Sequence, residues 1–151
     1  MSTASASAST DRIALSTRFG EFEADSRNLL SFPSGLPGFE QCHRFVLLAS
    51  VEAAPLQVLM SVDGPPASFL VIEPRIVLPT YRCVLSQSDR QRLGAAEGDS
   101  VLWLSLLTVK EDGSAFANLR APVVINPAQM VGYQVVPQDS LYPLRHPVTL
   151  D

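Results

Sequence analysis

Few side chains in this 151-residue sequence are of the types that bind metals, and their spacing does not favour a site. The candidates are two cysteines, Cys42 and Cys83, and two histidines, His43 and His146. Cys42 and His43 are adjacent, so on a strand their side chains point to opposite faces and do not reach one metal ion. We therefore expect no metal site and two reduced, partly buried thiols.

Catalytic constellations are also missing. Cys83 and His146 would form a nucleophile and base only if the fold brought them together, and nothing in the sequence indicates that it does. Asp63 and Glu73 follow apolar runs, where carboxylates usually form solvated turns rather than acid–base pairs. The sequence has no G-x-S-x-G motif, no phosphate-binding glycine loop and no H-E-x-x-H motif. We predict a protein that is not an enzyme and that uses no cofactor.

The composition is that of an ordinary globular protein. Hydrophobic residues make up 46% and charged residues 17%, which excludes wholesale disorder. A net charge of -4 without a basic cluster argues against direct nucleic-acid binding, and fits either plain solubility or a basic partner. No stretch approaches the roughly 20 apolar residues of a membrane-spanning helix. We expect no membrane partner and a cytoplasmic location.

The chain is expected to form one domain with a short tail. Residues 1–10 are almost all Ser, Ala and Thr, and they lack both the basic start and the apolar run of a signal peptide. We predict a disordered tail over residues 1–11 and a single domain over 12–151, because no repeat or linker divides the rest.

Glycine and proline recur at short intervals between runs of Val, Leu, Ile and Phe, a rhythm typical of short strands joined by turns. Only residues 86–94 suggest a helix, with serine at its start and glycine at its end. The absence of long helices between strands excludes a parallel α/β sheet. We predict an all-β fold: an antiparallel β-barrel-like domain with one short helix. Strands are expected at residues 13–23, 28–32, 44–48, 56–62, 68–73, 81–85, 101–109, 115–119, 123–125 and 132–136.

Three segments combine prolines with apolar or aromatic residues. Residues 31–40 form a stiff loop that is either a packed corner or a preorganised binding surface, and packing is favoured. Residues 117–127 bracket a buried strand with prolines and asparagines, which also favours a structural role. Residues 142–147 are either a tail pinned to the barrel by Tyr142 and Leu144 or a binding surface, and the sequence does not decide between them.

In this order, these segments resemble the family of flagellar assembly factors called FliW. The resemblance covers residues 17 to 148. Three positions depart from the family pattern: Gly64 stands where a second acid is expected, Glu73 replaces aspartate, and Pro137 interrupts a strand. The matching stretches are TRFGE (17–21), FPSGLPGFE (32–40), RFVLL (44–48), SVD (61–63), FLVIEP (69–74), ANLRAPVVINP (117–127), QVV (134–136) and YPLRHP (142–147).

The resemblance implies a β-barrel-like protein without catalytic activity that binds flagellin in the cytoplasm before export. It further implies binding of the small RNA-binding translational regulator CsrA, which lifts repression of flagellin synthesis. The mild acidity of the chain suits such a basic partner. We predict that reversing Asp63 and Glu73 to lysine weakens regulator binding and leaves the melting temperature close to that of the wild type. The predicted contacts, chosen at loops and strand ends, are Phe39, Asp63, Glu73, Tyr142, Arg145 and His146.

An alternative from another class is a small split β-barrel that binds a flavin-type cofactor as an oxidoreductase. A barrel with the single tryptophan, Trp103, permits it, but no cluster of Arg, Lys, Ser and Gly supports phosphate binding.

Overall fold

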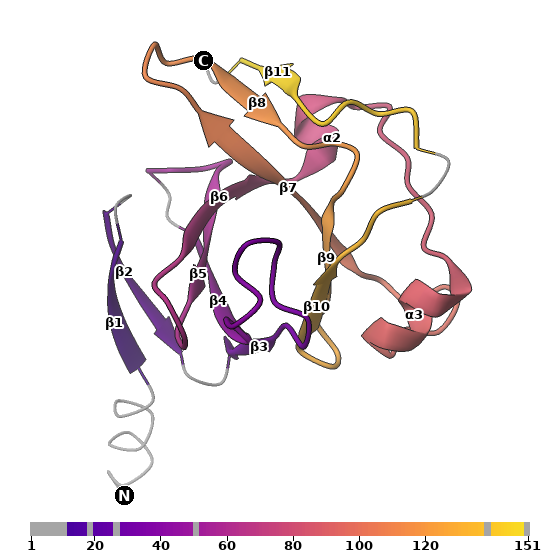
Figure 1. Cartoon of the computed structure of the whole chain (residues 1–151), viewed down its shortest axis with the longest axis horizontal. Helices are drawn as coiled ribbons and strands as arrows, with labels where there is room; N and C mark the ends of the chain where they lie inside the picture. The colour runs from indigo at the N-terminus through magenta and orange to yellow at the C-terminus, as the bar shows by residue number, and fades with distance from the viewer. Residues whose placement is uncertain (1–11, 18–19, 26–27, 50–51, 138–139, 150–151) are drawn as a thin grey trace, which may run out of the picture.

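The larger sheet of the protein curls into a ring (Figure 1). The computed structural model describes residues 12–17, 20–25, 28–49, 52–137 and 140–149. The tail predicted over residues 1–11 lies outside these residues. The strands are β1 (Arg12–Thr17), β2 (Gly20–Asp25), β3 (Leu30–Ser31), β4 (Arg44–Ala49), β5 (Gln57–Ser61), β6 (Ser68–Ile72), β7 (Leu102–Val109), β8 (Ala115–Ala117), β9 (Val123–Asn126), β10 (Val131–Gln134) and β11 (His146–Val148), and the helices are α2 (Pro74–Val77) and α3 (Gln87–Leu93).

Strand β7 closes the ring. The sheet runs in the order β11-β8-β7-β6-β5-β4-β3-β10-β9, and β9 pairs back onto β7. Residues 102–104 of β7 pair with β9 and residues 107–109 pair with β8, while Ser105 and Leu106 pair with β6 on the other edge. The pair β8–β11 therefore extends from the ring. The predicted antiparallel pairing holds throughout the described strands except between β3 and β10, which are parallel.

The predicted elements need four corrections; besides the three below, strand β11 was not expected, because its three residues are too few to show alternation. The single strand expected over 13–23 is the hairpin β1–β2, whose register pairs Thr17 with Gly20, because alternation does not mark where a chain reverses. A second helix, α2, accompanies the predicted one; its four residues are too few for a helical period to appear in the sequence. Residues 81–85 form no strand of the described sheets. Helix α3 is as predicted, with Ser86 at its start and Gly94 at its end.

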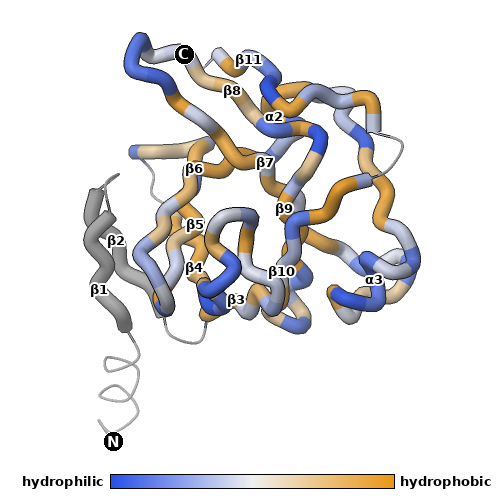
Figure 2. The backbone as a smooth tube through the Cα atoms, viewed as in Figure 1, coloured by the Kyte–Doolittle hydropathy of each residue, from blue (hydrophilic) through white to orange (hydrophobic). Residues whose placement is uncertain are grey.

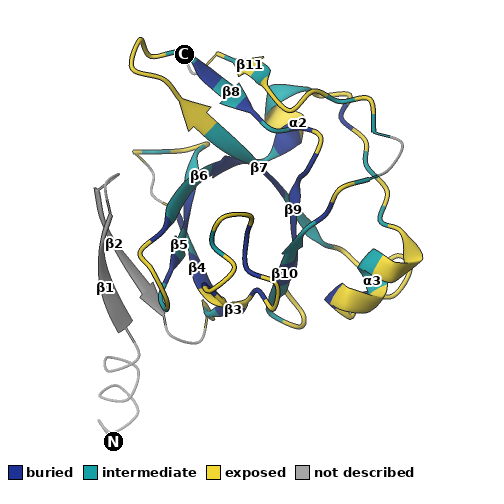
Figure 3. Ribbon diagram, in the orientation of Figure 1, coloured by how far each residue is buried: buried dark blue, intermediate teal, exposed yellow. Residues whose placement is uncertain are grey.

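The loop that connects β3 to β4, residues 32–42, fills the ring (Figure 3). Phe32 and Leu36 of this loop are almost fully buried, and the Phe32 ring meets that of Phe45 edge-on at a centroid distance of 4.9 Å. A Cβ at Gly132 would lie 2.5 Å from Cζ of Phe32, so the close approach of β10 to this ring requires glycine. We call residues 32–42 the plug; the structure supports the packing interpretation of this loop.

Smaller apolar clusters lie outside the ring. One contains Val46, Leu48 and Val58, a second packs Leu93 of α3 against β9 and β10, and a third gathers around Tyr81. Figure 2 shows the apolar segments concentrated on the ring strands, with polar residues on α3. None of the described helices has the length and apolarity needed to cross a bilayer.

Candidate functional site

The predicted apolar contact, Phe39, belongs to the plug. Its side chain is half-buried and meets Phe69 of β6 edge-on, with ring centroids 5.2 Å apart. Its amide donates to the carbonyl of Leu36 at 2.7 Å, which closes the turn between the two residues. Phe39 therefore contributes to packing at the rim of the ring.

Asp63 fastens the end of the plug. One carboxylate oxygen, Oδ1, accepts the backbone N–H groups of His43 and Arg44, both at 3.0 Å. Next to it, the Cys42 thiol donates to the carbonyl of Pro65 at 3.2 Å. A carboxylate that satisfies two backbone donors has a structural role whether or not it also meets a partner.

The glycine that follows Asp63 explains one departure from the family pattern. Gly64 has φ +66°, and a Cβ there would lie 2.9 Å from the carbonyl oxygen of Gln41 in the plug. A second acidic residue at this position would be strained in its backbone and would displace the plug. The turn therefore carries one carboxylate only.

Glu73 caps helix α2. Its Oε2 accepts the backbone N–H of Arg75 at 3.0 Å, and Pro74 occupies the first turn. Since β5 and β6 are antiparallel, Asp63 after β5 and Glu73 after β6 lie at opposite ends of this strand pair. The structure does not bring the two predicted acidic contacts together.

Tyr142 anchors the C-terminal segment, residues 140–148, to the ring. Its ring stacks on Tyr81 with centroids 4.6 Å apart, and its hydroxyl accepts the Arg82 backbone N–H at 2.8 Å. Its carbonyl accepts Nε of Arg120 at 2.8 Å. Leu144, the second expected anchor, is 53% exposed. The interpretation as a pinned tail is therefore right for Tyr142 and wrong for Leu144.

Arg145 and His146 lie on the same segment. The Arg145 guanidinium stands 4.8 Å from the ring centroid of Phe116, and Lys110 approaches the same ring at 5.3 Å. His146 begins β11, where it pairs with Ala117 and is half-buried. Tyr142, Arg145 and His146, the three predicted contacts of the terminal surface, thus lie on one segment.

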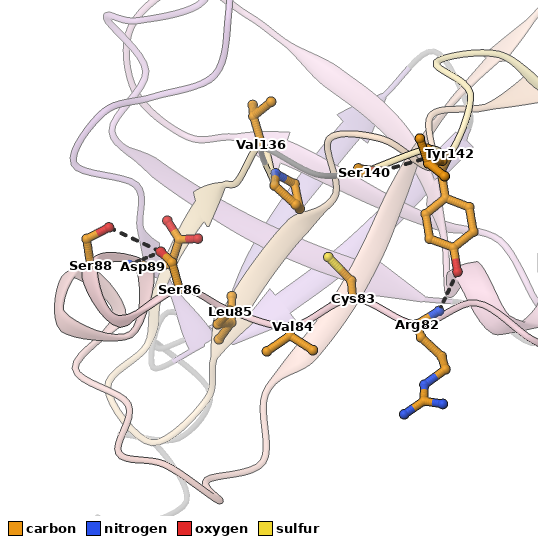
Figure 4. Close-up of a pocket in the computed structure, with 12 residues that line it drawn as sticks. Arg82, Cys83, Val84, Leu85, Ser86, Ser88, Asp89, Val136, Ser140 and Tyr142 are labelled. Carbon is orange, nitrogen blue, oxygen red and sulfur yellow. Dashed lines mark hydrogen bonds between the residues drawn. The ribbon is translucent and has the colours of Figure 1, made fainter.

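The sequence did not predict a groove on the described surface of the chain. It lies between residues 82–89 on one side and residues 136–137 and 140–142 on the other, and it has a volume of about 790 Å³ (Figure 4). Val84, Val136 and Leu141 line it with exposed fractions of 81%, 66% and 95%, the highest of any large hydrophobic residue described. Apolar side chains this exposed around one groove are typical of a surface that binds another molecule.

The groups at the base of this groove are not set up for nucleophilic catalysis. Burial raises the pKa of the Cys83 thiol and, with Cys83 beside it, that of the Tyr81 hydroxyl. The groups that act on this thiol are Tyr81, Val84 and Asp89, and His146 is not among them. A thiol kept protonated is a poor nucleophile. In the residues that the structure describes, no group of three or more His, Cys, Asp or Glu side chains is placed to hold a metal ion.

A family model described as "FliW protein" matches residues 14–148. The chain belongs to the FliW family. This match includes almost the whole stretch, 17–148, on which the sequence resemblance rests.

Individual FliW proteins agree with this assignment. The chain is 35% identical over 138 residues to the flagellar assembly factor FliW of Natranaerobius thermophilus, covering 90% of this chain and 91% of that one. It is 35% identical over 136 residues to that of Carboxydothermus hydrogenoformans, covering 89% and 88%. A crystal structure of the flagellar assembly factor FliW superposes with a TM-score of 0.79 at 31% identity, covering 91% and 97%. The ring of strands is therefore the FliW fold.

Proposed function

We propose that this chain is a flagellar assembly factor that acts in the cytoplasm by binding proteins and not by catalysis. It binds flagellin before export; when flagellin is drained by secretion, it binds the CsrA-type RNA-binding regulator and relieves repression of flagellin synthesis. The observation that carries the proposal is membership of the FliW family over residues 14–148. Relatives that align over about nine-tenths of both chains bear the name flagellar assembly factor.

The geometry supports binding more than chemistry. Side chains of the plug fill the interior of the ring, which does not favour a flavin held inside it. The carboxylates of Asp63 and Glu73 are engaged by backbone N–H groups. The three most exposed apolar side chains, those of Val84, Val136 and Leu141, line the groove, on the surface where a protein partner can reach them.

Two purified partners test the proposal. Titration calorimetry with flagellin and, separately, with the CsrA-type regulator is expected to give a complex in each case. The affinity of the regulator for a flagellin leader RNA should fall when this chain is added, and flagellin added afterwards should restore that affinity. Regulator binding to RNA that stays unchanged at saturating concentrations of this chain would contradict the antagonism, while leaving flagellin binding to be judged by its own titration.

A further inference from the structure

Residues 81–85 have the side-chain pattern of a strand but no strand beside them. Tyr81 is buried and Cys83 and Leu85 are half-buried, whereas Arg82 and Val84 are exposed. Alternation of this kind arises when an extended chain turns one face to a core. Figure 4 shows Cys83 and Val84 pointing to opposite sides of the segment. The sequence predicted a strand here because the pattern is real, and what is missing from the described residues is its partner.

The backbone of this segment offers an edge for pairing. The Arg82 N–H donates to the hydroxyl of Tyr142, which closes one end of the groove. In an extended chain the backbone groups of alternate residues point the same way, so those of Val84 face the same edge. Among the described residues the Val84 N–H approaches only the sulfur of Cys83, a weak acceptor, and Leu85 offers its carbonyl to Arg90.

The groove also has a charge at one end. The Arg82 side chain is exposed, and in the described part of the chain it takes part in no ion pair or hydrogen bond, unlike Arg90 and Arg92 near the other end. An exposed guanidinium that has no partner among the described residues, beside apolar side chains, fits a molecule that carries a carboxylate next to an apolar stretch. It fits a basic partner less well, because the Asp89 carboxylate on the lining is already paired with Arg92.

We propose that an extended, largely apolar segment of an acidic partner binds in this groove as an added strand along residues 82–85. Its backbone pairs with that of Val84, its apolar side chains pack on Val84, Val136 and Leu141, and its carboxylate reaches Arg82. The inference rests on the proposed function for the identity of the partner: of the two partners proposed, Arg82 disfavours the basic regulator, so we assign the segment to flagellin. The regulator then binds on a different surface.

Substitutions separate backbone pairing from side-chain contact. Val84→Pro removes the backbone donor, whereas Val84→Ala keeps it, so we expect flagellin affinity about tenfold weaker or more for the first and within about threefold of wild type for the second. Leu141→Asp should also cost about tenfold or more, while Leu144→Asp, on the same segment but outside the groove, should cost nothing. Calorimetry with purified flagellin gives the affinities, and thermal unfolding checks that each variant is folded.

Hydrogen exchange of the wild-type chain tests the pairing without any substitution. The Val84 amide is expected to exchange more slowly in the flagellin complex and at its free rate in the regulator complex. Failure of the wild-type chain to bind flagellin would overturn the proposed function and this inference together. Flagellin binding that leaves the Val84 amide unprotected, or that Leu141→Asp does not weaken, would overturn the inference alone.

Discussion

The plug and the segment at residues 81–85 are both irregular stretches rich in apolar side chains, yet the fold uses them in opposite ways. The plug turns Phe32 and Leu36 into the ring, where they become the centre of the core. The other segment lies across the outside of the ring and leaves Val84 in solvent. In the first, apolar surface stabilises the fold; in the second, it is left for another molecule. Composition alone does not separate the two roles, since what differs is whether the ring closes around the segment.

The largest expected effect tests the structural half of this comparison. Phe32→Ala should lower the free energy of unfolding by about 3–5 kcal/mol, because it leaves a cavity against Phe45 and Gly132. Val84→Ala is the matched control in the other segment and should change it by less than about 0.5 kcal/mol. Urea unfolding followed by fluorescence measures both. Equal losses in the two variants would remove the distinction between the segments.

Asp63 tests how the plug is held. Asp63→Ala leaves the N–H groups of His43 and Arg44 without their acceptor and should cost about 1.5–3 kcal/mol, whereas Asp63→Asn keeps an acceptor oxygen and should cost less. The exposed Glu97, changed to alanine, serves as control. A loss of stability in Asp63→Ala would also mean that reversing Asp63 to lysine lowers the melting temperature, whereas the sequence predicted a melting temperature close to that of the wild type. An Asp63→Ala chain as stable as wild type would restore that expectation.

Tyr142 tests the closed end of the groove. Tyr142→Phe keeps the ring on Tyr81 but removes the oxygen that accepts the Arg82 N–H, and it should cost about 0.5–1.5 kcal/mol. Denaturant unfolding measures the loss, and Tyr142→Leu, which also removes the ring stacking, should cost more. If phenylalanine and leucine prove equally harmful, packing and not the hydrogen bond fixes this end.

The smallest effect concerns pH. Burial raises the pKa of the Cys83 thiol, so above about pH 8.5 the unfolded chain loses this proton before the folded chain does. The unfolding free energy should therefore fall as the pH rises from 8 to 10. In Cys83→Ser the unfolding free energy should fall less over this pH range. The decrease that remains is due to other groups such as Tyr81. Urea unfolding at both pH values checks this, and parallel declines in the two chains would contradict a shifted thiol.

Much of the fold could be predicted because its signals are local. Helix α3 begins at a serine and ends at a glycine, and each of these residues marks its end of the helix without reference to the rest of the chain. Most strands follow from apolar runs between turns. The boundary of β1, the four residues of α2 and the three residues of β11 escaped prediction, because a hairpin reversal, a single helical turn and so short a strand produce no period.

The groove could not be predicted for a different reason. Its walls come from residues 82–89 and from residues 136–137 and 140–142, which are distant in sequence. The apolar residues that line it are of the same types as core residues, and only the fold leaves them exposed. Asp63 and Glu73 illustrate the reverse error. Both stand at strand ends, as expected of contact residues, but only the coordinates show that backbone N–H groups occupy their carboxylates.

The plug has a consequence for the order of folding. It joins β3 to β4, which are neighbours in the ring that it fills. A ring that closed without it would enclose a void where Phe32 and Leu36 now lie, and voids of that size are strongly unfavourable. A closed but empty ring is therefore not a stable intermediate. The loop must therefore pack before or together with the β7–β9 closure, and a chain that ends before β9 lacks the strand that closes the ring.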